Sequence, residues 1–80
     1  MANERARLRR SAGLTQLQLA LRVGMSASQI CLWEHSEIEL SAADVEQIAR
    51  AIEAELNRFP APSSLAQIVT ALSDPVRMGA

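Results

Sequence analysis

The sequence predicts an all-α fold from three observations. Its 80 residues are 49% apolar but include only one Trp and one Phe, so a core has to be built from Leu, Ile, Val and Ala. Runs of strand-forming residues and hairpin dipeptides such as Asn-Gly are missing. Apolar residues recur instead at helical spacing behind Ser and Thr residues that can cap helices. A chain of this length forms one small domain with a marginal core, which favours dimerisation.

The first helix is expected at residues 3–12. Asn3 can cap its start, and Gly13 can end it. Leu8 and Ala12 stand four residues apart and would form its buried edge.

Two further helix starts follow closely. Thr15 with Gln18, and Ser26 with Gln29, match the capping box, in which the hydroxyl accepts a hydrogen bond from an amide of the first turn and the glutamine reaches back. Apolar residues on one face follow each cap, and Gly24 ends the first of these two helices. Because only two residues separate that helix from the Ser26 cap, the two helices must turn sharply against each other. The spacing therefore predicts a helix-turn-helix.

A longer helix is expected after a loop at residues 35–40. Ser41 and Asp44 match a third capping box, and apolar residues then follow at helical spacing as far as Leu56.

A linker and a last helix are expected near the C-terminus. Pro60 and Pro62 disfavour helix in the residues that precede them and mark a linker. Ser63 or Ser64 can cap an amphipathic helix beyond it. Its apolar face would serve dimerisation or packing, and consists of Leu65, Ile68, Val69 and Leu72.

Several short motifs occur in a consistent order along roughly residues 5–56. They are Leu8-Arg9, Gly13-Leu14-Thr15-Gln16, Leu19-Ala20, Val23-Gly24-Met25-Ser26, Ile30, Trp33-Glu34 and Ile48-Ala49-Arg50-Ala51-Ile52. Together they resemble the Cro and lambda-repressor-like (Xre-type) helix-turn-helix family. The resemblance implies five packed helices, the third inserted in the major groove of double-stranded DNA, and usually a dimer on a two-fold symmetric operator. We therefore expect a five-helix DNA-binding domain at residues 1–59, and an additional linker and C-terminal helix at residues 60–80.

The resemblance also implies site residues. Gln16 would contact a phosphate and brace a side chain of the third helix, and Thr15 and Ser26 would contact phosphates at the two helix starts. Arg9 and Glu34 match a structural ion pair. The residues expected to contact base edges are Ala27, Ser28, Gln29 and Leu32, with Cys31 beside them.

The sequence departs from the family pattern in three respects. The family usually has a glycine two residues after the glutamate that matches Glu34, and here that position is Ser36. The chain can therefore leave the third helix with a different shape. The loop at residues 35–40 is acidic. Gln29 is the only side chain among residues 26–33 suited to bidentate base recognition, and its own helix cap can occupy it. Ser28 can bond either base edge, while Ala27 and Leu32 suit thymine methyl groups, so methyl contact, phosphate contact and DNA shape would dominate recognition.

Charge is distributed unevenly along the chain. Residues 1–33 carry +4, residues 34–57 carry −6 and residues 58–80 carry +1, within a net charge of −1. Such asymmetry can create a face that attracts phosphate. The alternative is that these charges belong to an ordinary solvated surface. The candidate phosphate partners are Arg5, Arg7, Arg10 and Arg22.

Leu17 and Leu21 stand four residues apart on the outer face of the second helix, where the family usually has polar residues. They are either scattered surface leucines, or a stripe covered by the C-terminal helix or by a partner chain.

Other classes of function have little support in the sequence. It shows no set of nucleophile, base and orienting residue, no glycine-rich phosphate loop and no carboxylate pair in an evident pocket, so we expect no enzyme. One Cys and one His exclude an internal disulfide and leave too few ligands for zinc, and we expect no cofactor. No signal peptide or membrane span is evident, so we expect a cytoplasmic, nucleoid-associated protein without a membrane partner. The expected function is a small dimeric autorepressor. The alternatives are an antitoxin-like regulator that holds a protein partner through its C-terminal segment, and a helix-turn-helix scaffold without DNA binding.

Overall fold

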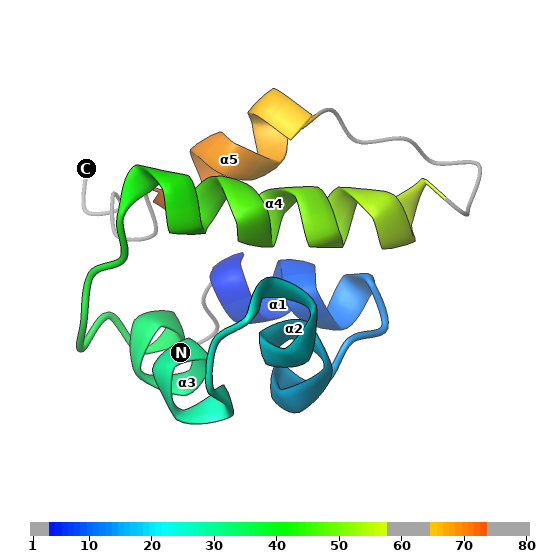
Figure 1. The fold of residues 1–80 in the computed structure, drawn as a ribbon. Coiled ribbons are helices and arrows are strands. Elements are labelled where there is room, and N and C mark those ends of the chain that lie inside the picture. The colour runs from blue at the N-terminus through cyan, green and yellow to red at the C-terminus, as the bar shows by residue number, and fades with distance from the viewer. Residues whose placement is uncertain (1–3, 58–64, 74–80) are drawn as a thin grey trace.

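A computed structural model describes residues 4–57 and 65–73. These residues form five helices and no strand, which confirms the all-α class (Figure 1). In chain order the helices are α1 (Glu4–Ser11), α2 (Gln16–Val23), α3 (Ala27–Glu34), α4 (Ala42–Leu56) and α5 (Leu65–Ser73). The predicted cap at Asn3, the linker at Pro60 and Pro62, and the cap at Ser63 or Ser64 lie outside the described residues.

The helix starts follow from side-chain capping. Thr15 Oγ1 accepts a hydrogen bond from Gln18 N at 3.0 Å, and Gln18 Oε1 accepts one from Thr15 N at 2.9 Å. Ser26 and Gln29 repeat this arrangement at the start of α3, with both distances 3.1 Å. Two of the three predicted capping boxes are therefore formed in full. At the start of α4, Ser41 Oγ accepts a hydrogen bond from the Asp44 amide at 3.1 Å.

Residues in the left-handed region end the first three helices. Gly13 follows α1 with φ 77°, and Gly24 is the C-cap of α2 with φ 73°. Ser36, just beyond α3, adopts φ 61°. Ser36 thus adopts the left-handed backbone conformation that glycine adopts most easily. The chain leaves α3 in this conformation although the residue there is a serine.

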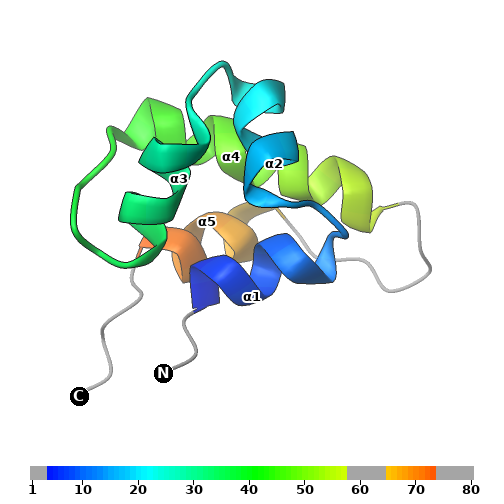
Figure 2. The same ribbon diagram turned by 90° about the horizontal axis from the view of Figure 1, so that it is seen from below.

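The core forms where α4 packs against α1, α2 and α5, and side chains of α3 join it. α4 runs through the middle of the molecule, with α1 and α2 on one side, and α5 lies against both α4 and α1 (Figures 1 and 2). α2 and α3 pack against each other as a helix-turn-helix. The largest fully buried side chains come from all helices except α1, and are Leu19, Ile30, Trp33, Ile48, Ile52, Ile68 and Leu72.

The helix near the C-terminus differs from expectation in its place in the fold. We expected it as an addition to a five-helix domain, but among the described residues it is the fifth helix itself. Ile68 and Leu72 lie in the common core, and Leu65 and Val69 pack against that core half-buried. α5 therefore completes the hydrophobic core.

The second helix keeps an exposed apolar stripe. Leu17 is 58% exposed and Leu21 is 73% exposed. The expectation that α5 could cover these leucines is thus wrong, because the apolar face of α5 is turned to α4 and α1. Among the described residues, no helix combines the length and hydrophobicity that a bilayer span requires.

Candidate nucleic-acid interface

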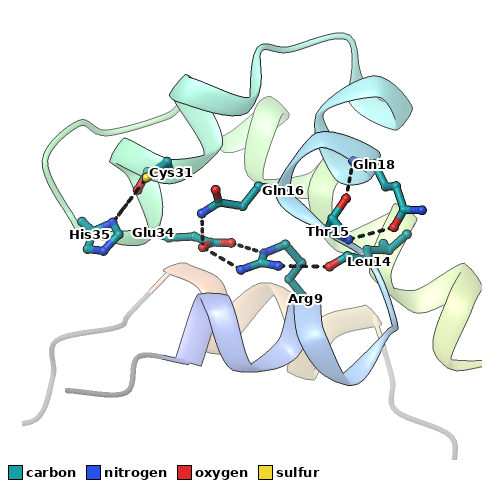
Figure 3. A network of polar contacts seen from close by, with 8 residues as sticks. All are labelled: Arg9, Leu14, Thr15, Gln16, Gln18, Cys31, Glu34 and His35. Atoms are coloured by element: carbon teal, nitrogen blue, oxygen red, sulfur yellow. Dashed lines mark hydrogen bonds and ion pairs between the residues drawn. The ribbon is translucent and has the colours of Figure 1, made fainter.

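A hydrogen-bonded network joins the first three helices (Figure 3). Arg9 on α1 donates from Nε to Glu34 Oε2 at 2.6 Å and from Nη2 to Glu34 Oε1 at 3.2 Å. Arg9 Nη1 also donates to the Leu14 carbonyl at 3.0 Å. Gln16, the first residue of α2, donates from Nε2 to Glu34 Oε1 at 3.0 Å. Glu34, the last residue of α3, is therefore fixed to both neighbouring helices.

The position of Gln16 has a direct consequence for α3. Gln16 was expected to contact a phosphate and to brace a side chain of the third helix. The structure describes the second of these contacts, to Glu34. The main-chain amides in the first turn of a helix lack intrahelical acceptors and attract anions. Thr15 and Ser26 cap the starts of α2 and α3, and the network joins the start of α2 to the end of α3.

We call the outward face of α3 the recognition face, and define it by Ala27, Ser28 and Leu32. Ser28 is exposed, Leu32 is 39% exposed and Ala27 is half-buried. Gln29 is also exposed, but its Oε1 accepts the Ser26 amide and so forms part of the cap. α3 carries no charged residue before Glu34. The recognition face therefore offers an aliphatic surface and one hydroxyl.

The histidine after α3 caps that helix. His35 Nδ1 lies 2.8 Å from the Cys31 carbonyl oxygen and 3.8 Å from Cys31 Sγ (Figure 3). Because a carbonyl oxygen can only accept, Nδ1 carries the proton in this contact. The imidazole thus stabilises the C-terminal end of α3.

The expected role of Arg5 as a phosphate contact is wrong. Arg5 is 3% exposed. Its Nε donates to the Leu72 carbonyl at 2.8 Å, and its Nη1 donates to the Trp33 carbonyl. Its guanidinium carbon lies 4.4 Å from the centre of the Trp33 ring. Arg5 stands four residues before the buried Arg9 and therefore on the same face of α1. This spacing is the feature of the sequence that indicates burial of Arg5.

Burial lowers the pKa of the Arg5 guanidinium below its ordinary value, while the carboxylates of Glu39 and Glu34 raise it in part. The guanidinium is tolerated in the interior because carbonyl oxygens and an aromatic ring face it.

The other candidate cations differ in availability. Arg22 pairs with Glu55 on α4, a partner that sequence reasoning did not identify. Arg7 pairs with Glu4 on its own helix. Arg10 is exposed, and none of the ion pairs found among the described residues includes it. Of the four arginines, Arg10 alone is both exposed and outside these ion pairs.

Comparison with known protein families bears on this arrangement. The helix-turn-helix family model matches residues 6–59, from α1 to the end of α4. The chain belongs to this family, in its Xre/Cro type. No curated protein and no solved structure matched the chain. Helix-turn-helix proteins of this type are DNA-binding regulators and typically not enzymes, so α2 and α3 form the DNA-binding motif of a regulator.

Proposed function

We propose that this helix-turn-helix protein is a sequence-specific transcriptional repressor that binds double-stranded DNA as a homodimer. α3 lies in the major groove of each half of a palindromic operator, and one such operator lies in the promoter of the protein's own gene. The observation that carries the proposal is the network through Glu34. It fixes the end of α3 to α1 and α2 while Ser28 and Leu32 stay exposed on the opposite face.

Recognition in this proposal rests mainly on the C5-methyl groups of thymine. Those methyl groups lie in the major groove and are contacted by apolar side chains. Leu32 and Ala27 supply such contacts, and the Ser28 hydroxyl bonds a base edge. Gln29 contributes less to base recognition, because its Oε1 is used at the Ser26 amide.

Phosphate contacts then set the position of the protein on the duplex. The amides at the starts of α2 and α3, the hydroxyls of Thr15 and Ser26, and the Gln16 amide group supply neutral contacts. Arg10 supplies a cationic contact, and Arg22 can do so where phosphate competes with Glu55.

The test is a gel shift against the promoter of the gene itself at low salt. Ser28→Glu places a carboxylate on the recognition face, so binding should fall at least tenfold through repulsion from the duplex. Gln47→Glu is the matched control, since Gln47 is exposed on α4 and the charge change is the same. Equal binding by both variants would contradict insertion of α3. Sedimentation of the free protein and of the complex tests the dimer.

The exposure of Leu17 and Leu21 favours a second candidate function. Two exposed leucines four residues apart suit a protein partner, as in an antitoxin-like regulator or a scaffold without DNA binding. Absence of any DNA binding by the wild-type protein at low salt would select the scaffold. Replacing both leucines by Ser should leave DNA binding unchanged if the stripe serves a partner other than DNA.

A further inference from the structure

Arg5 lies at the point where the ends of two helices meet. Trp33 belongs to the last turn of α3, and Leu72 to the last turn of α5. The guanidinium donates to the main-chain carbonyls of both residues, although Arg5 is 28 positions from one and 67 from the other. The C-terminal end of a helix carries a partial negative charge, which a cation stabilises. Arg5 thus serves two helix ends at once.

The two helices that Arg5 joins pack mainly against other elements. α5 lies against α4 and α1, whereas α3 packs against α2. Trp33 is fully buried, and Arg5 contacts both its ring and its carbonyl oxygen. The orientation of Trp33, and with it the end of α3, therefore depends on where the guanidinium is held. Leu72 is the contact that holds it from the side of α5.

We propose that Arg5 is a positioning residue that couples the C-terminal helix α5 to the recognition helix α3. If the last turn of α5 withdraws, the guanidinium loses an acceptor inside the protein, which is costly for a charged donor. The contact to Trp33 is then weakened as well. By linkage, order in α5 stabilises α3, and order in α3 stabilises α5 to the same extent.

The first test uses amide hydrogen exchange on the free protein and does not depend on DNA. Arg5→Met keeps an unbranched apolar side chain but removes the donors. Arg5→Lys keeps the charge and N–H donors but loses the planar guanidinium that reaches both carbonyls. Exchange should rise at least tenfold in α3 and α5 together in Arg5→Met, while residues 45–52 of α4 keep their protection. Arg5→Lys should retain part of the protection that Arg5→Met loses. Arg50→Met, which changes an exposed arginine on α4, should match the wild type.

A purely structural role of Arg5 predicts a different result. Exchange would then rise equally in all helices as global stability falls, and this result would overturn the proposal. Trp33 is the only tryptophan of the chain, so its emission reports on the contact directly. The emission spectrum should change in both Arg5 variants and stay unchanged in Arg50→Met.

The second test uses the wild-type protein and keeps the proposal falsifiable if Arg5→Met fails to fold. It rests on the proposed DNA binding. Promoter DNA that slows exchange in α3 should also slow exchange in residues 65–73, although α5 lies outside the helix-turn-helix. Slower exchange in α3 alone would contradict the coupling. If the wild type binds no DNA, the proposed function fails, and exchange in the free Arg5→Met or Arg5→Lys protein still decides whether the coupling exists.

Discussion

Arg9 and Glu34 form a two-bond ion pair across 25 positions of the chain, with side chains only 10% and 2% exposed. A buried pair of this kind contributes little net stability compared with an apolar pair, but it is costly to break. Its role here is geometric, since the same carboxylate also accepts the Gln16 amide.

Glu34→Gln should destabilise the protein by about 3–5 kcal/mol, because Arg9 is left buried without its counter-charge. Urea unfolding followed by circular dichroism measures this change. Glu46→Gln is the control, as it breaks the exposed pair with Arg50 and should cost about 1 kcal/mol or less. Adding Arg9→Met to Glu34→Gln should recover part of the loss, and a fully additive double variant would argue against the pair.

Ser36→Gly should stabilise the protein by about 1 kcal/mol, because glycine adopts a positive φ without the clash that a Cβ creates. A thermal melt should show an increase of roughly 4–8 °C for a domain of this size. Ser36→Ala keeps a Cβ at the same φ and should stay close to the wild type. A melting temperature that falls in Ser36→Gly would show that this turn does not strain the chain.

Leu72→Ala should destabilise the protein by about 2–5 kcal/mol, since Leu72 is fully buried in the common core. A chain that ends at residue 60 should lose its cooperative unfolding transition, because Ile68 and the acceptor of Arg5 are lost as well. Thr70→Ala, on the exposed face of α5, is the control and should have little effect.

Replacing thymine by uracil in the operator should weaken binding at the positions that Leu32 and Ala27 contact. Each lost methyl contact is worth about 0.8 kcal/mol, or about a fourfold change in affinity. The measurement is a gel shift with duplexes substituted one position at a time. Duplexes that bind equally with uracil at every position would exclude methyl recognition.

Arg10→Gln should reduce the salt dependence of DNA binding, lowering the slope of log K against log salt by about 0.9. Arg7→Gln should have a smaller effect, because Arg7 is paired with Glu4. Filter binding across a range of salt concentrations measures both slopes. Equal slopes for Arg10→Gln and the wild type would remove Arg10 from the phosphate contacts.

The helix starts were predictable from the sequence because their interactions are local. Thr15 and Gln18, like Ser26 and Gln29, are three residues apart and form their hydrogen bonds within one turn. The orientation of α2 and α3 followed from the short connection through Gly24. The exposed face of α3 followed from helical periodicity once those starts were known.

The hydrogen-bond partners of Arg5 could not be predicted in the same way, although its spacing from Arg9 indicated which face of α1 it lies on. The sequence shows a basic stretch, and only the folded chain brings the Leu72 carbonyl next to a guanidinium 67 positions away. For a related reason, the sequence left open whether the C-terminal helix serves packing or dimerisation. Its apolar face was recognised, but periodicity alone does not distinguish a helix that completes a core from one that joins two chains. Glu55 as the partner of Arg22 is a third contact set by tertiary structure.

The separation of the recognition face from the Glu34 network suggests a use in protein engineering. Ser28 and Leu32 are exposed, whereas the interactions that hold α3 in place lie on its buried side. Exposed positions usually change stability by no more than about 0.5 kcal/mol when substituted. If α3 reads DNA as proposed, a library that varies only these two residues can be screened for new operator sequences while the scaffold continues to fold.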